Sequence, residues 1–266
     1  MHLQAAYPTP EHQAAADAIT EFFSMRFQVD AVLVVNSCAR GKATGDSCLD
    51  MNVLVQPEPL HAQRQLLEKE WEGFNATSPI IQSLQQAGQH SVVHLDILDG
   101  VFVPRERDEV AGPDGFELEV GNMLAYGVPL WQGSDYLARL KRQWLPYYDE
   151  ELRRLRLNMV RHSCLDNLHH IPLYVARDLY FQSFDRLYNA YREFLQALFI
   201  TRRIYPIAYN KWIREQIEEI LELPQLYTQL THLFEIQQFE SHELVAKARE
   251  VEQLLEEYAP EPDPAA

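Results

Sequence analysis

Residues 36–53 read NSCARGKATGDSCLDMNV, and the fold of the amino-terminal part of the chain can be worked out from them. An apolar run at residues 31–35 precedes this stretch, and a second apolar run ends at Val55. Small, hydroxyl-bearing and cationic residues lie between, a composition suited to a loop that wraps an anion. From residue 48 onward polar and apolar residues alternate, as in a strand with one buried face. The stretch therefore predicts a strand, a small-residue loop and a second strand.

This pattern resembles the head of the nucleotidyltransferase superfamily, which has the DNA polymerase beta-like fold. The family pattern reads G-S-x-A-R-G-x-A-x-x-x-S-D-x-D and is followed by apolar positions. Asn36 stands where the family has its first glycine, a mild change because asparagine tolerates unusual backbone angles. Cys48 stands where the family has its first metal-binding aspartate, and this change affects the chemistry. Seven residues fall in register with the pattern: Ser37, Ala39, Arg40, Gly41, Ala43, Ser47 and Asp50.

The resemblance implies an α/β (α+β) nucleotidyltransferase-like head with a small mixed sheet. It also implies transfer of a nucleoside monophosphate from ATP or another nucleoside triphosphate to a hydroxyl of a small-molecule or protein acceptor. The cofactor implied is Mg²⁺ or Mn²⁺, held by Asp50 and by Asp96, which matches the family's third metal carboxylate. Asp96 lies within the apolar stretch at residues 91–99. An aspartate in such a strand is costly unless it is paired or bound to metal.

Four residues of the loop are predicted to bind the nucleotide. Ser37 and the backbone amides around it are expected to hold phosphate oxygens, as nests of amides do. Arg40 and Lys42 are expected to neutralise triphosphate charge, although a solvated pair of loop cations is the simpler alternative for both. The resemblance adds Ser47 to this nucleotide site.

Position 48 leaves two functional hypotheses open. A thiol is a poor ligand for Mg²⁺, so Cys48 weakens the metal site unless Asn52 or Asp46 substitutes for the missing carboxylate. If one of these two residues does substitute, the chain is an active nucleotidyltransferase. Otherwise it is a degenerate protein that binds nucleotide or a partner without turnover. For Asp50 itself, the alternative to a metal ligand is a strand-end aspartate held by backbone amides.

The remaining elements of the head follow from periodicity and turn signals. A polar loop with Gly-Pro-Asp-Gly turn chemistry is expected at residues 105–115, and Ser78 is expected to cap a helix that begins at Pro79. Helices are predicted at residues 10–27, 60–74 and 79–89, and strands at 28–35, 49–55, 91–99 and 116–120.

The period changes near residue 120, which divides the chain into a nucleotidyltransferase-like domain at 1–120 and a helical bundle domain at 121–258. A bulky stripe at helical spacing supports the longest helix. The prolines of residues 259–266 predict a disordered tail. Helices are expected at residues 135–144, 148–162, 172–203, 211–222, 224–237 and 241–258.

The second domain contains the segment FITRRIYPIAYNKW at residues 199–212, similar to an R-x-Y-P…K-W element of uncharacterised helical domains that follow such heads. Arg203 and Lys211 are candidates for reaching the triphosphate, and Lys211 is assigned to the nucleotide site. Alternatively, Arg203 interacts with the dipole at the end of its helix, and Lys211 packs its aliphatic chain on apolar surface with the amine in water. Further titratable residues lack ligand spacing or a selecting feature: His162, His169, His170, Cys164, Glu117 and Glu119.

Composition limits the partners. The 266 residues carry a formal net charge of −16, which repels polyanions, so binding of bulk nucleic acid is not expected. No apolar run approaches the about 20 residues of a membrane span, and no signal peptide is recognised. Three scattered cysteines fit a reducing cytoplasm. The expected partners are a nucleoside triphosphate and its acceptor, and a homodimer is compatible with the sequence.

Overall fold

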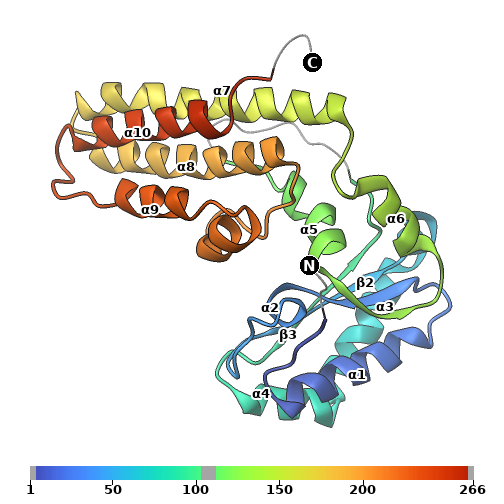
Figure 1. Cartoon of the computed structure of the whole chain (residues 1–266). Helices are drawn as coiled ribbons and strands as arrows, with labels where there is room; N and C mark the ends of the chain where they lie inside the picture. Colours follow the sequence, from blue (N-terminus) through green and yellow to red (C-terminus); the bar gives the residue numbers. More distant parts are fainter. Residues whose placement is uncertain (1–3, 103–111, 263–266) are drawn as a thin grey trace. The chain divides into compact units, whose positions relative to one another are not determined.

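The computed structural model describes residues 4–102 and 112–262, which form two compact units (Figure 1). Unit 1 consists of residues 4–102 and 119–145, and unit 2 of residues 112–118 and 146–262. The chain therefore passes from unit 1 to unit 2, returns to unit 1, and then continues in unit 2. This division differs from the predicted single boundary at residue 120, because a short segment before that residue packs with the helices while the 26 residues after 119 pack with the sheet.

Unit 1 is built on a four-stranded sheet with the order β3-β2-β1-β4. β1 pairs antiparallel with both β2 and β4, whereas β2 and β3 are parallel. The small mixed sheet that the sequence predicted is thus confirmed. The strands are β1 (Ala31–Val34), β2 (Leu49–Leu54), β3 (Val93–Leu98) and β4 (Val128–Gln132).

The central strands β1 and β2 are buried along their whole length. One face of the sheet, with Met51 and Val53, packs in a core with α1 and α4. The other face, with Leu33 and Leu54, packs against α5 and α6. Because both faces of β2 are covered, its polar residues are buried too, which a strand with one buried face did not predict.

The fourth strand was not predicted, and a different strand was predicted in its place. β4 contains Pro129 and lies at the edge of the sheet, where a missing N–H is tolerated. The strand expected at residues 116–120 is wrong, because this segment forms a 3₁₀ turn, Phe116–Leu118, followed by α5 (Val120–Tyr126). Of the loop expected at 105–115, residues 105–111 lie outside the described residues.

Helices surround the sheet of unit 1. Thr9 caps α1 by accepting a hydrogen bond from the His12 amide, and Ser78 caps α4 as predicted by accepting one from the Ile81 amide. α3 begins at Pro57, earlier than expected, since proline is favoured in the first helical turn. The helices are α1 (Pro10–Ser24), α2 (Asn36–Ala39), α3 (Pro57–Thr77), α4 (Pro79–Ala87) and α6 (Tyr136–Trp144).

The described part of unit 2 contains helices and no strand. α7, α8 and α10 run side by side around one apolar core, as Figure 1 shows. No helix in the part of the chain that the structure describes has the length and apolarity to cross a membrane. The helices are α7 (Glu150–Val175), α8 (Tyr180–Arg202), a π-helix η2 (Glu215–Ile220), α9 (Pro224–Leu233) and α10 (Glu243–Tyr258).

Two expectations for unit 2 are wrong. The predicted interruption between residues 162 and 172 does not exist, because α7 runs through and holds Pro172 in its last turn. The chain turns instead at Asp178, whose φ of 59° is left-handed. Ala259, assigned to the disordered tail, is buried, and Arg161 donates a hydrogen bond to its carbonyl.

Candidate functional site

The loop between β1 and β2 begins with a left-handed residue. Asn36 has a φ of 55°, which explains how it can replace the glycine of the family pattern. α2 follows directly, and the carbonyl of Ser37 accepts hydrogen bonds from the amides of Arg40, at 3.3 Å, and Lys42, at 2.9 Å. Ser37 is buried, Arg40 is partly buried and Lys42 is exposed. The first half of the loop is thus a compact turn.

A buried histidine anchors the second half of this loop. His12 of α1 has no exposed surface, and its Nε2 lies 2.9 Å from the carbonyl oxygen of Ser47. Its Nδ1 lies 2.9 Å from the hydroxyl of Thr9. A carbonyl only accepts, so Nε2 carries the proton and Nδ1 accepts from Thr9. His12 therefore holds the residue just before Cys48, a role that sequence reasoning missed.

The end of the loop is tied to the turn before β3. Asp46 accepts a hydrogen bond from the Gln89 amide at 3.1 Å, and Ser91 donates one to the Gly45 carbonyl at 2.8 Å. A Cβ on Gly88 would lie 2.6 Å from that same carbonyl, so the approach requires glycine. Asp46 is thereby held to this turn.

Three side chains meet at the start of β2. The thiol of Cys48 donates to Oδ2 of Asp50 at 3.3 Å, and Nδ1 of His94 lies 3.2 Å from Oδ1 of the same carboxylate. One donor atom from each residue can be chosen so that all three lie within 4.8 Å of one another. Only 11% of the Asp50 side chain is exposed, against 65% of the His94 side chain. The group is thus buried on one side and open on the other.

The pairing of β2 with β3 decides which residues share this face. Asp50 pairs with His94, and Asn52 pairs with Asp96. Paired residues of neighbouring strands lie on the same face of a sheet, so Asp50 and Asp96 share a face with an offset of two residues. Asp96 is exposed and is not one of the three clustered residues. His94 is two residues from Asp96 on the same strand, and the register of β2 with β3 brings it close to Asp50.

Cys38 lies beneath the same site. Burial, together with the nearby Asp50 and Cys48 side chains, raises the pKa of the Cys38 thiol to about 12. Its side chain is 1% exposed. Cys38 therefore stays protonated at neutral pH and contributes to packing rather than to nucleophilic chemistry.

The residues predicted to act from the second domain belong to unit 2. Lys211 is exposed, and its carbonyl accepts a hydrogen bond from Gln216. Arg203 caps α8 with a left-handed φ of 54° and forms an ion pair with Glu150 at 2.9 Å. Tyr205, from the same R-x-Y-P element, is buried. Much of this element is thus structural.

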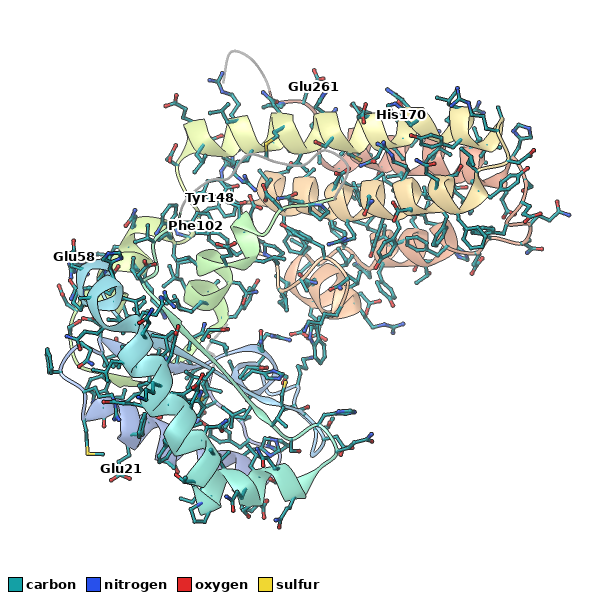
Figure 2. The ribbon with its side chains drawn as sticks, turned by 180° about the vertical axis from the view of Figure 1, so that it is seen from behind. Glu21, Glu58, Phe102, Tyr148, His170 and Glu261 are labelled. Carbon is teal, nitrogen blue, oxygen red and sulfur yellow. The ribbon has the colours of Figure 1, made fainter. Side chains whose placement is uncertain are left out.

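The histidines of α7 are at least partly exposed, and its cysteine is buried. His162 and His169 are exposed, and His170, labelled in Figure 2, lies along α7 with its Nδ1 2.8 Å from the Asp166 carbonyl oxygen. Cys164 is fully buried and donates to the Ala190 carbonyl.

Glu117 is the centre of a buried polar network in unit 2. It has no exposed surface and forms a bidentate ion pair with Arg156, with N–O distances of 2.5 and 3.0 Å. Tyr148, labelled in Figure 2, donates to Glu117 at 2.9 Å, and Gln196 donates at 2.7 Å. Asp114 also accepts from Arg156, at 2.6 Å. Sequence reasoning had no means of selecting Glu117, since its partners come from distant segments.

The chain thus combines an α+β unit with a helical unit. The mixed sheet of the α+β unit carries a thiol, two carboxylates and an imidazole on one face.

No protein-family model matches this chain, and no curated protein matches it in sequence. Among solved structures it is similar to a nucleotidyltransferase-like protein from Exiguobacterium sibiricum 255-15. The two are 14% identical, the match covers 92% of this chain and 74% of the other, and the TM-score is 0.46. No residue role follows from a likeness at this level.

Proposed function

We propose that the chain is a nucleotidyltransferase-like protein, which transfers a nucleoside monophosphate from ATP or another nucleoside triphosphate to a hydroxyl of a small-molecule or protein acceptor. The observation that carries the proposal is the register of β2 and β3. In that register Asp50 and Asp96 share one face of two neighbouring strands. The motif loop runs directly into the first of these strands. These two aspartates correspond to two of the three metal carboxylates of the resembling family, and they lie beside the loop that is proposed to hold the triphosphate.

The residues fit a magnesium site only in part. Bound Mg²⁺ or Mn²⁺ supplies charge stabilisation to the transferring phosphoryl group, and Mg²⁺ favours oxygen ligands such as those of Asp50 and Asp96. Cys48, however, puts a soft sulfur donor at the first ligand position of the family pattern. The proposed roles therefore rest on the side chains of the chain itself, and they do not include a step at magnesium.

Those roles follow from chemistry and position. Arg40 and Lys42 are cations in the motif loop, suited to neutralising triphosphate charge. Ser37 and Ser47 carry hydroxyls for phosphate oxygens; in the structure the Ser47 hydroxyl accepts from the Thr44 amide at 2.9 Å.

A second function is favoured by one specific contact. The Cys48 thiol donates to Asp50 at 3.3 Å, so the position that holds a metal carboxylate in the resembling family holds a hydrogen-bond donor here. This arrangement fits a protein that binds nucleotide, or a partner, without turnover.

The two functions are separated by binding and turnover measured on the same preparations. The melting temperature is recorded with each of the four nucleoside triphosphates, with and without Mg²⁺ or Mn²⁺, because a ligand of the native state raises it. Pyrophosphate release is then measured for wild type and for Asp50→Asn and Asp96→Asn. Asp17→Asn, at an exposed position of α1, is the matched control.

A nucleotidyltransferase releases pyrophosphate in wild type and in Asp17→Asn, and both other variants abolish the release. Nucleotide-dependent stabilisation without pyrophosphate release supports the binding function. Absence of any nucleotide-dependent shift, with no pyrophosphate release, rejects nucleotide binding altogether.

A further inference from the structure

The donor atoms that gather at the start of β2 are of a different kind from those of a magnesium site. They are the thiol of Cys48, the carboxylate of Asp50 and the imidazole of His94. We propose that these three side chains form a binding site for a borderline-soft divalent ion of the zinc class. Among the described residues this is the group of histidine, cysteine and acidic side chains whose donor atoms are close enough to share one ion.

The distances from Asp50 to its two neighbours are close to those between zinc ligands, and the three donor atoms lie within 4.8 Å of one another. Bond lengths of about 2.0–2.3 Å and tetrahedral angles place two ligand atoms of one zinc ion about 3.3–3.6 Å apart. Here Sγ of Cys48 lies 3.3 Å from one oxygen of Asp50, and Nδ1 of His94 lies 3.2 Å from the other. An ion can therefore be accommodated by small side-chain movements, with no change in the strands.

The chemistry of the donors decides which ion binds. Thiolate and imidazole select zinc and its neighbours, whereas Mg²⁺ takes oxygen ligands and gives up its water reluctantly. One thiolate, one imidazole and one carboxylate make three protein ligands. Zinc sites with three protein ligands keep a fourth position for water or substrate, and closed structural sites have four. The proposed site is accordingly of the open kind.

The surroundings of the three residues hold them in place and leave access. Asp50 is 8% exposed and lies on a central strand, so its carboxylate is positioned by the sheet. Cys48 directly follows Ser47, whose carbonyl is held by the buried His12. His94 is on the edge strand β3 with most of its side chain in solvent, so an ion can enter from that side.

This inference concerns the same sheet face as the proposed function, and it names the ion that this face prefers. It stands on three side chains and needs neither nucleotide nor acceptor. Asp50 belongs to both proposals, whereas Asp96 belongs only to the proposed function and Cys48 and His94 belong only to the metal site. A failure of nucleotide binding therefore leaves the metal site untouched, and the reverse also holds.

The test is metal binding by the full chain after treatment with a chelator. Zn²⁺ affinity is measured by competition with a chromophoric chelator, and Co²⁺ is added separately to record the thiolate-to-cobalt charge-transfer band. Mg²⁺ is the third ion. The variants are Cys48→Ser and His94→Gln; Cys164→Ser and His61→Gln are the matched controls, since Cys164 lies in unit 2 and His61 is exposed on α3.

Wild type is expected to bind one equivalent of Zn²⁺ and to show the cobalt band, with no competition from Mg²⁺. Changing a ligand should lower the Zn²⁺ affinity by about tenfold or more, since even outer-shell changes cost that much. Both control variants should bind as wild type does. The proposal is overturned if wild type binds Zn²⁺ no more tightly than Cys48→Ser, or if Co²⁺ gives no thiolate band. Circular dichroism of each variant establishes that a loss of binding is not a loss of folding.

Discussion

Replacing Cys48 by aspartate is expected to make the stability of the folded state depend on a bound hard divalent cation. The substitution restores the carboxylate that the resembling family has at this position, and it places that carboxylate next to Asp50. Without a metal ion the two negative charges repel each other. With Mg²⁺ or Mn²⁺ bound, the same oxygens become ligands. The folded state should therefore be weakened in the absence of the ion and restored in its presence.

The size of the effect follows from the distance between the two groups. At the 3.3 Å that separates Sγ of Cys48 from Asp50, two unit charges repel by about 1 kcal/mol in bulk water and by about 5 kcal/mol at an effective dielectric constant of about 20. Asp50 is 8% exposed and Cys48 is partly exposed, so the penalty should lie between these values. His94 reduces the penalty only when it is protonated.

The pH dependence of this penalty has a definite sign. Each carboxylate disfavours ionisation of the other, so the pKa of one rises in the folded state. A raised folded-state pKa gives stability at low pH that is lost as pH increases. The stability difference from wild type should therefore be small below a pH of about 4 and reach its full size near neutral pH.

The assay is urea unfolding at neutral pH with a chelator, with Mg²⁺ and with Mn²⁺. Cys48→Asn is the control, because it changes shape as aspartate does without adding charge. We expect Cys48→Asp to be less stable than Cys48→Asn with the chelator and to recover with either ion, while wild type responds to neither. Equal stability of the two variants in chelator, or no recovery with the ions, would refute the arrangement of Cys48 beside Asp50.

Three further predictions concern the surrounding structure. His12→Ala should cost about 2–4 kcal/mol in unfolding free energy, since it removes a buried ring and its hydrogen bond to Ser47; urea unfolding checks this, and a loss under about 0.5 kcal/mol would contradict it. Glu117→Gln should destabilise unit 2 by about 3–5 kcal/mol because Arg156 loses its buried partner. Unfolding followed by near-ultraviolet circular dichroism measures this, and an unchanged midpoint would argue against the ion pair. Burial opposes ionisation of Asp114, but its contacts with Arg156 outweigh burial and lower its pKa. The ionised Asp114 therefore contributes to folding stability above the ordinary aspartate pKa, and this contribution is lost as pH falls through the lowered folded-state pKa. Asp114→Asn should lose less unfolding free energy than wild type as the pH is lowered into the acid range. If the unfolding free energies of the two proteins fall in parallel with pH, Asp114 makes no such contribution.

Local patterns in the sequence were sufficient for the elements around the site. Periodicity at residues 48–55 and 91–99 predicted β2 and β3. The small-residue run predicted the loop, and asparagine at position 36 is compatible with the left-handed backbone that the structure has there. Ser78 before Pro79 predicted the start of α4. Such features are readable because each depends on a few neighbouring residues.

The tertiary structure alone decided which of these residues meet. Asp50 and His94 are 44 positions apart, and only the parallel register of β2 with β3 brings them together. β4 was missed because its strand character comes from pairing with β1 at a sheet edge. Glu117, which lies in the segment predicted as a strand at residues 116–120, is buried because Arg156 compensates its charge. Pairing and burial depend on contacts between distant segments, whose free energy no local pattern contains. The sequence therefore determined the elements and the type of their side chains, and packing determined the site.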